Sequence, residues 1–421
     1  MNDRKEGFVL IFAMLFILVI FVIAVSYLGI ASNEVQLSRR SADNVQAYYA
    51  AEAGVARMLI LLKEDTSLRN TNGTINLAAG DSATFNVVVT LLGTTPPAFR
   101  ITSTGTYNGI VKIINFSIRG RPASFFAMFN NTDDRGNTHV YHITGDTITG
   151  PYHVNDRMNI AGSPQFLGPV SSTAATINYY NGGPPRDNPL FAVSLNLGAP
   201  AIAFPTVANT VTPLRALAQG GGLYLEGNSG VTLRQNGTMD VVNGARNRAN
   251  GQPNDFAENM LIPANGVLFV NNGDLNISGI MNGQLTAATN RNINIVGDTF
   301  YNNDPVTDPA STDILGLIAE RDISVARSAP FNVNIDACIL ALGSFGAEVW
   351  NSQLRGTLNI YGSIAQDVRG IIGQFNNSGR VSGYTKNYIY DQRLNSSMPP
   401  FFPMLRDIIG WSYIKVSWNE S

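Results

Sequence analysis

The three histidines of the chain, His139, His142 and His153, fall within 15 residues and could bind a metal ion together. The aspartates nearby are Asp133, Asp134, Asp146 and Asp156. Imidazole and carboxylate groups hold a metal only when they converge from defined faces. On one strand, His139 and His142 would point to opposite faces, although His153 could approach His142 from a neighbouring strand. We predict neither a metal ion nor another cofactor, and these histidines remain the candidate ligands.

Carboxylates in the C-terminal half raise the question of a polysaccharide-active enzyme, which needs two carboxylates close to the scissile bond. The candidates are Asp298, Asp304, Asp308, Asp313, Glu320 and Asp322. Aromatic residues that could stack on sugars are Tyr179, Tyr180, Tyr224, Trp350 and Tyr361. The acids are scattered over predicted turns, and the sequence lacks the phosphate, dinucleotide, zinc-protease and serine-hydrolase motifs. We predict that the chain is not an enzyme, with a membrane-anchored β-helix enzyme as the alternative.

The composition argues against a nucleic-acid partner. The 28 basic and 30 acidic residues give a net charge of -2, so no positive field attracts a polyanion. Only 14% of the residues are charged, and the 40 glycines and 20 prolines suit turn-dense β structure. A single cysteine, Cys338, excludes an intrachain disulfide and is expected to be buried.

The elements that carry these residues follow an apolar run over residues 8–30. A helix of 23 residues spans about 34 Å, enough to cross a hydrocarbon core of about 30 Å. A secretory signal peptide would have a shorter apolar core and then a cleavage site. Here a helical pattern continues without proline, which predicts one helix from about Phe8 to Lys63 that binds the bilayer through its first half. The apolar stripe predicted for its second half contains Val35, Tyr49, Val55, Leu59 and Leu62.

The junction Gly7–Phe8, after a short charged leader, resembles the class III signal of type IV pilins and type II secretion pseudopilins. The stretch AYYAAEAGVARML, residues 47–59, is similar to the N-terminal family of PilX-type minor pilins. The resemblance implies that prepilin peptidase cuts after Gly7 and leaves Phe8 as a methylated first residue. Phe12 stands where major pilins carry a glutamate that pairs with a neighbouring subunit. This departure implies an accessory subunit that does not form a long fibre by itself.

The resemblance also implies a location and partners. The precursor would cross the inner (cytoplasmic) membrane once, with the bulk of the chain extracytoplasmic and later on the cell surface or in a pilus. Its partners would be prepilin peptidase, other pilins and pilus-assembly proteins. Basic residues lie on both sides of the span, namely Arg4, Lys5, Arg39 and Arg40. The positive-inside rule therefore leaves the topology open, and an uncleaved single-pass anchor is the alternative.

Three β-rich runs after the helix predict a small antiparallel sheet within strands 84–119. The runs are 84–92, 99–107 and 110–119, with a loop predicted over 67–81. Asn108 and Gly109 form a hairpin signal, because a type I′ turn needs positive φ at both central residues. We expect residues 1–7 to be a leader and residues 8–120 to form a pilin-like module.

From residue 121 to 395 the chain predicts a β-solenoid, with a β-sandwich as the alternative. A tetrapeptide Asn-Ile-x-Gly recurs at 159–162, 276–279, 294–297 and 359–362, with a weaker copy at 334–337. Its isoleucines, Ile277, Ile295, Ile335 and Ile360, are expected to point inward, and its asparagines to bond between neighbouring coils. No amphipathic helix of ordinary length is predicted here, so the fold class is α+β and mainly β.

The C-terminal residues 396–421 are predicted to cap an open end of the solenoid, where an unpaired strand would otherwise be exposed. Parts of the C-terminal half resemble bacterial proteins that attach such β domains to a PilX-like helix. The parts are 150–162, 316–325, 383–403 and 411–418. We predict a minor pilin-like subunit with a structural or adhesive role, and a surface polysaccharide is a candidate ligand. A structural envelope protein outside a pilus is a further alternative.

Overall fold

The computed structural model describes residues 3–77, 81–243, 255–376, 379–407, 410–411 and 413–420. The chain folds into two compact units. Unit 1 contains Met1–Leu92, Phe99–Ile118 and Lys415–Ser421, and unit 2 contains Gly93–Ala98 and Arg119–Ile414. Most of unit 2 is therefore inserted into the sequence of unit 1, shortly before its last strand.

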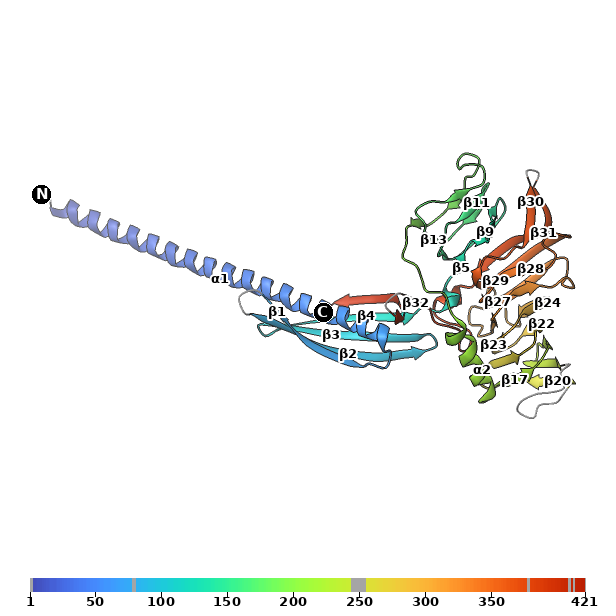
Figure 1. Cartoon of the computed structure of the whole chain (residues 1–421). Helices are drawn as coiled ribbons and strands as arrows, with labels where there is room; N and C mark the ends of the chain where they lie inside the picture. Colours follow the sequence, from blue (N-terminus) through green and yellow to red (C-terminus); the bar gives the residue numbers. More distant parts are fainter. Residues whose placement is uncertain are drawn as a thin grey trace. The chain divides into compact units, whose positions relative to one another are not determined.

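Helix α1 (Asp3–Glu64) is the long N-terminal helix, blue in Figure 1. It confirms the single long helix predicted from the apolar run. The side chains of Leu10, Phe16 and Leu28 are 65%, 62% and 70% exposed, and the same holds for the apolar residues between them. A helix that is apolar on every face, and that no other part of its own unit covers, is typical of a segment that enters lipid or a helical assembly.

The C-terminal half of α1 packs on the sheet of unit 1 through small residues. Its buried apolar side chains are Ala47, Ala50, Ala51, Val55, Met58 and Leu62. The predicted stripe is right for Val55 and Leu62 but wrong for Val35 and Tyr49, which are 52% and 56% exposed. Small alanine side chains form much of this contact face because the helix lies very close to the strands. A Cβ on Gly105 would overlap the backbone of Ala47 and Ala51.

Unit 1 contains a five-stranded sheet in the order β1-β2-β3-β4-β34. The strands are β1 (Asn70–Asn76), β2 (Ser82–Thr94), β3 (Pro97–Tyr107), β4 (Ile110–Gly120) and β34 (Tyr413–Glu420). Burial alternates along β2, so one face covers the helix. The turn between β3 and β4 has positive φ at Asn108 (48°) and Gly109 (77°), as predicted. The loop expected over 67–81 is partly wrong, because β1 pairs antiparallel with β2.

The last strand of the predicted C-terminal cap, β34, belongs to the sheet of unit 1. β34 lies beside β4, where Trp418 packs edge-on against Phe116 at 5.3 Å between ring centroids. Within unit 2, Pro400 accepts a hydrogen bond of 2.5 Å from Thr286, and Phe402 is buried. Both residues lie against strands of the stack, Pro400 beside Thr286 and Phe402 beside Gly316.

Unit 2 is built around one large sheet whose main ladder consists of parallel, in-register pairs. In spatial order the ladder contains β16 (Ser194–Leu197), β13 (Pro169–Ser172), β10 (Tyr152–Val154), β5 (Met128–Thr132), β29 (Leu354–Val368), β27 (Val333–Ala341), β25 (Ile314–Ala319), β23 (Gln284–Thr289), β21 (Val267–Asn271) and β17 (Leu223–Glu226). A β-sandwich is instead built from antiparallel strands. The structure confirms a large β-rich region with several sheets after the helix.

Two longer parallel ladders, a third and shorter one, and several short elements complete unit 2. One ladder contains β18 (Ser229–Leu233), β22 (Leu275–Met281), β24 (Ile293–Tyr301), β26 (Ile323–Val325) and β28 (Phe345–Ala347). The other contains β15 (Leu190–Phe191), β12 (Gln165–Phe166), β9 (Thr147–Ile148) and β31 (Gly379–Tyr390). The remaining strands are β6 (Asp134–Arg135), β7 (Thr138–His139), β8 (His142–Ile143), β11 (Asn159–Ala161), β14 (Asn178–Tyr179), β19 (Thr238–Asn243), β20 (Asp255–Leu261), β30 (Gly373–Asn376), β32 (Arg406–Asp407) and β33 (Gly410–Trp411). Short 3-10 helices are Ala123–Phe125, Val207–Asn209 and Gln392–Asn395.

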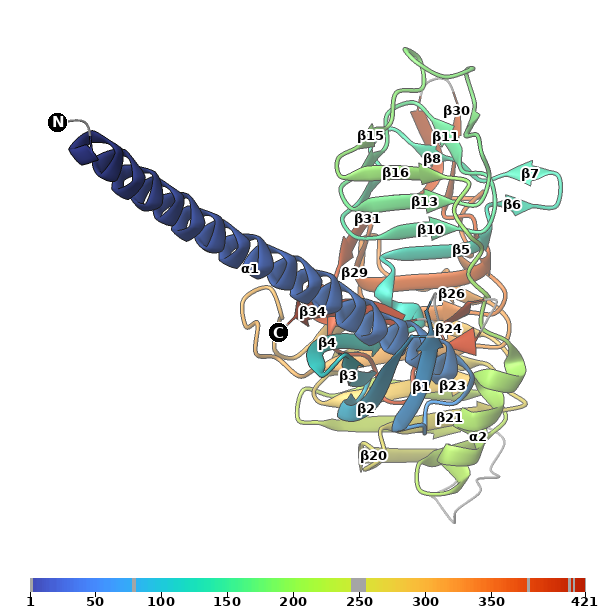
Figure 2. The same cartoon turned by 90° about the vertical axis from the view of Figure 1, so that its left-hand side faces the viewer.

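The strands of the main ladder do not follow one another in chain order. Met128 of β5 pairs with Ile364 of β29, although more than 200 residues separate them in the sequence. The chain therefore runs outward from the middle to β16, crosses to the far end and winds back to the middle. Figure 2 shows β16, β13, β10, β5 and β29 side by side. The order of the strands in the ladder therefore differs from their order in the sequence.

The repeated tetrapeptide occupies matching positions on neighbouring strands. Ile277 pairs with Ile295, and Ile335 pairs with Ile360; all four are buried, as predicted, and so is Cys338. The asparagine side chains bond from strand to strand, as predicted. The amide of Asn294 donates to Asn276 (2.9 Å), that of Asn359 to Asn334 (3.1 Å) and that of Asn387 to Asn359 (2.9 Å).

One amphipathic helix in unit 2 was not predicted. Helix α2 (Val211–Gln219) buries Val211, Leu214 and Ala218 beside β17 and β21. Its nine residues give only two and a half turns, too few for a helical period to stand out in the sequence.

The two ends of unit 2 run side by side. Pro122 and Met404 form an antiparallel bridge. The backbone N–H of Ala123 donates to Pro403 (2.9 Å), and that of Leu405 donates to Arg121 (2.8 Å). Adjacent chain ends are what allow a whole domain to be inserted into a loop of another.

Candidate functional site

The exposed apolar half of α1 is the first candidate site. Among the described residues, the segment Val9–Glu64 is the one helix long and apolar enough to cross a membrane, with a mean hydropathy of 3.3 in its most apolar window. None of that window is buried within the structure. Gly7 and Phe8 lie in the first turns of α1, and their side chains fall outside the described ones. Phe12 is 68% exposed on the helix surface.

The three histidines bind different partners. His139 Nδ1 lies 2.8 Å from Asp134 Oδ1, and His142 Nε2 lies 3.2 Å from the Tyr152 hydroxyl. The ring of His153 bonds instead to Ser171 Oγ (2.7 Å) and to an asparagine. Over the described part of the chain, no three His, Cys, Asp or Glu side chains are placed to hold a metal ion.

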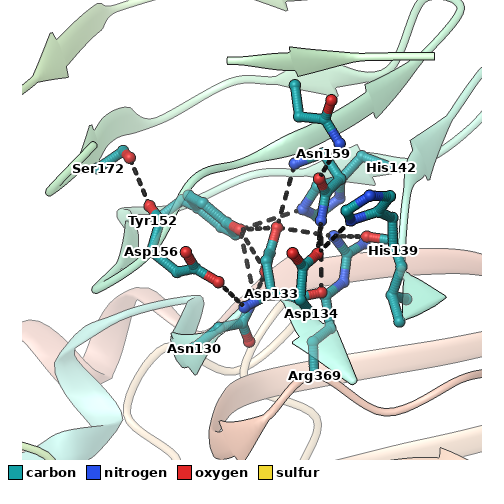
Figure 3. Close-up of polar contacts among 12 residues, drawn as sticks. Asn130, Asp133, Asp134, His139, His142, Tyr152, Asp156, Asn159, Ser172 and Arg369 are labelled. Carbon is teal, nitrogen blue, oxygen red and sulfur yellow. Dashed lines mark hydrogen bonds and ion pairs between the residues drawn. The ribbon is translucent and has the colours of Figure 1, made fainter. Parts of the chain in front are cut away.

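A buried ion pair lies beside His142. Arg369 Nη1 donates to Asp133 Oδ2 at 3.2 Å, and the two side chains are 2% and 0% exposed. Asn130 Nδ2 donates to Asp133 Oδ1 (2.7 Å), and the Tyr152 hydroxyl donates to the same oxygen (3.3 Å). Figure 3 shows these side chains converging on Asp133. The network joins β5 and β10 to the end of β29, so it ties the two series of strands together.

Burial sets the protonation of this network. Burial holds the pKa of His142 well below its usual value, helped by the nearby charge of Arg369, so the ring is neutral at neutral pH. Burial also raises the pKa of Tyr152 well above its usual range. For Asp133, burial raises the pKa and the guanidinium of Arg369 opposes the rise. His142 and Tyr152 are therefore neutral hydrogen-bonding groups beside the buried pair of Asp133 and Arg369.

A second buried ion pair joins β31 to the loop before β9. Lys386 Nζ lies 2.5 Å from Asp146 Oδ2, and the side chains are 13% and 4% exposed. Burial lowers the pKa of Lys386, while the carboxylate of Asp146 opposes this effect. The second Asp146 contact is a hydrogen bond of 3.0 Å from the backbone N–H of Ile143.

Both buried cations line a cavity of about 350 Å³. Its aromatic lining residues are Tyr141, Phe345, Trp350, Phe375, Tyr384 and Tyr388. A third cation, Arg380, lines it as well, and the described lining contains no aspartate or glutamate. The cavity therefore combines apolar walls with a few polar groups, which is typical of a ligand site.

The candidate catalytic aspartates accept hydrogen bonds from the backbone of the fold. Asp298, Asp304, Asp308, Asp313 and Asp322 each accept a backbone N–H. Glu320 lines a different cavity. Of the candidate sugar-stacking residues, Trp350 lines the cavity of about 350 Å³, whereas Tyr224 is buried and stacked on Phe269. Asp304 and Asp308 thus stabilise their own turns, whereas Asp298, Asp313 and Asp322 bond to residues of a neighbouring coil.

The half-buried carboxylate of Asp336, which lies between the buried residues Ile335 and Ala337 of β27, makes stability depend on pH. Burial raises its pKa to about 6, although Oδ2 accepts a hydrogen bond of 3.0 Å from the backbone N–H of Tyr301. The unfolded chain, with a pKa near 3.9, loses this proton first, so Asp336 makes stability fall as pH rises from about 4 to 6. Asp336→Asn should therefore stabilise the protein by on the order of 2 kcal/mol at pH 8 and by little at pH 4.

Urea unfolding at pH 4, 6 and 8 measures this effect. The exposed Asp308→Asn variant makes the same change in charge and should leave the pH dependence as in the wild type. Equal stabilisation by Asp336→Asn at pH 4 and pH 8 would show that Asp336 does not carry the effect.

The comparisons with known proteins add little. The sequence matches no family model and no curated protein. Among solved structures, the competence-associated pilin ComZ from Thermus thermophilus is similar, at 15% sequence identity and a TM-score of 0.40. The alignment covers 90% of this chain and 97% of that chain. A TM-score of this size does not establish a common fold and carries no argument about function.

Sequence reasoning found the helix and the histidines but not the cavity or its two buried ion pairs. In the sequence, Asp133 is marked only by its closeness to the histidines, and Arg369 lies 236 positions further along the chain. Lys386 and Asp146 are similarly far apart in the sequence, although their side chains are in contact. No local pattern marks such pairs, because they form only where β5 and β9 meet strands from the C-terminal half.

Proposed function

We propose that the chain is a pilin-like minor subunit of a type IV pilus or a related filament. The observation that carries the proposal is the continuous helix α1. Its N-terminal half exposes apolar side chains on every face, and its C-terminal half is packed on a small sheet. One helix thus joins a segment suited to lipid to a folded unit suited to water. This arrangement serves a subunit that is stored in a membrane and then assembled.

The exposed half of α1 would drive assembly. In the bilayer, lipid covers its side chains, so little is gained by contact with another helix. Once the subunit leaves the bilayer, each exposed apolar side chain costs about 1.5–3 kcal/mol unless a neighbouring helix covers it. Phe12, exposed on this surface, offers no charge to pair with a neighbour's N-terminus. The subunit would therefore join a filament of other pilins as an accessory component.

Maturation would begin with cleavage by prepilin peptidase between Gly7 and Phe8 at the inner membrane. The bulk of the chain would lie outside the cell. Unit 2, with its parallel ladders and rows of bonded asparagines, would be a β-solenoid that acts as a stiff spacer or adhesive surface.

Mass spectrometry of the N-terminal peptide from exported protein tests this function. The expected peptide starts at Phe8 and carries a methyl group. Gly7→Val should block processing, because a branched side chain stands at the scissile bond. The matched variant Gly29→Val changes a glycine of the same helix that has no neighbouring atoms within 4 Å. It should be processed like the wild type.

An exported chain that begins at Met1 would overturn the maturation step and favour a single-pass anchor. A chain that is processed but never recovered with other pilins in sheared filaments would point to an envelope protein outside a pilus. Release of reducing sugar ends from polysaccharides by the purified protein would instead favour the enzyme.

A further inference from the structure

The cavity of about 350 Å³ in unit 2 is lined by three cationic side chains, Arg369, Arg380 and Lys386. Two of its cations are neutralised, Arg369 by Asp133 and Lys386 by Asp146. The third, Arg380, donates from Nη1 to the carbonyl oxygen of Gly383 and forms no ion pair with the described residues. Burial alone lowers the pKa of Arg380, as expected for a guanidinium with no carboxylate beside it. The cavity therefore carries a net positive charge.

Hydrogen-bond donors at the cavity are also left over. Arg369 donates only from Nη1, to Asp133 and to the carbonyl oxygen of Val140 (2.9 Å), so its Nε and Nη2 have no acceptor among the described residues. This side chain is only 2% exposed, which makes unused donors costly unless water or a ligand accepts from them. A guanidinium fork matches the two oxygens of a carboxylate.

The walls of the cavity are aromatic. Phe345, Tyr384 and Tyr388 are buried at 1%, 2% and 4% exposure. Phe375 and Tyr141 are in edge-on contact at 6.1 Å between ring centroids. Aromatic walls of this kind can pack against the flat face of a ligand ring and exclude water from a charged group on that ligand.

We propose that this cavity binds a small carboxylate that carries a ring with an apolar face. Two sources share that chemistry: a uronic acid unit of an acidic polysaccharide, and an aromatic carboxylic acid. The carboxylate pairs with Arg380 and the free donors of Arg369, and the ring packs on the aromatic walls. A volume of about 350 Å³ lies near the lower end of the range of about 300–1,000 Å³ for ligand pockets, so one ring fits. The inference does not depend on a role in a filament.

Calorimetric titration of the full-length chain in a non-ionic detergent tests the proposal. The probes are galacturonate and phenylacetate, each compared with its neutral counterpart, galactose and 2-phenylethanol. At least one acid should bind, and its neutral counterpart should bind about 10- to 100-fold more weakly because it lacks a charge-assisted hydrogen bond. Binding of galacturonate alone identifies the sugar source, and binding of phenylacetate alone identifies the aromatic acid.

The variant Arg380→Gln should weaken binding of the acid by about 10- to 100-fold. It leaves no buried carboxylate without a partner, so the fold should persist, as circular dichroism can show. The matched variant Arg100→Gln removes one positive charge from unit 1 and should bind like the wild type. The proposal is overturned if neither acid binds, if the neutral counterparts bind equally well, or if Arg380→Gln and Arg100→Gln give the same affinity.

Discussion

Replacing Arg369 by glutamine is expected to lower the free energy of unfolding by about 3–5 kcal/mol. The change leaves the carboxylate of Asp133 in a site with no exposure to water and without its cation. Burial already raises the pKa of Asp133, so loss of the guanidinium leaves either a charge without a partner or a proton taken up at a cost. Urea unfolding of the full-length protein, followed by circular dichroism, measures the loss.

Two further variants separate the ion pair from its surroundings. In Asp133→Asn/Arg369→Gln both charges disappear, and most of the lost stability should return, because no unpaired ion remains. Arg291→Gln breaks a pair with Asp274 that spans 3.7 Å and is 45% and 35% exposed, so it should cost about 0–1 kcal/mol. An equal cost for Arg291→Gln and Arg369→Gln would contradict the importance of burial.

Replacing Gly105 by valine is expected to destabilise unit 1 by about 2–4 kcal/mol. The new Cβ would overlap the carbonyl oxygen of Ala47 and the backbone nitrogen of Ala51, and neither backbone atom can turn aside as a side chain could. The helix must then move away from β3 and lose contacts of Met58 and its neighbours with the sheet. Faster hydrogen exchange over residues 44–62, together with a lower unfolding midpoint, would record this separation.

Gly93→Val provides the matched control for Gly105→Val. Gly93 also lies in a strand, β2, but a Cβ there would meet no atom within 4 Å. The control should leave exchange in α1 unchanged. Unchanged exchange in Gly105→Val as well would show that the helix and the sheet are not in the close contact described.

The sequence was most informative where a signal is local. The apolar run predicted α1, and Asn108–Gly109 predicted the turn between β3 and β4. Both features depend on neighbouring residues alone. The Asn-Ile-x-Gly copies predicted which side chains point inward and which bond between strands. They could not predict the order of the strands, because the contact between β5 and β29 uses the same parallel pairing as the other contacts of the main ladder. The close approach at Gly105 depends on two segments that meet only in the fold.

The candidate site was harder to predict for the same reason. Each histidine was visible in the sequence, but its partner was set by strands from other parts of the chain. Arg369 and Asp133, or Lys386 and Asp146, give no periodic pattern and no motif. What decides their role is the absence of water around them, and burial is a property of the assembled strands.

The adjacent ends of unit 2 have a mechanical consequence. Arg121 and Leu405 are joined by a backbone hydrogen bond of 2.8 Å, and the bridge between Pro122 and Met404 follows at once. A tensile force carried along the polypeptide enters and leaves unit 2 within this short ladder. The force then does not pass through the stacked strands of unit 2. We therefore expect the stacked strands of unit 2 to keep their structure while the rest of the chain is under tension.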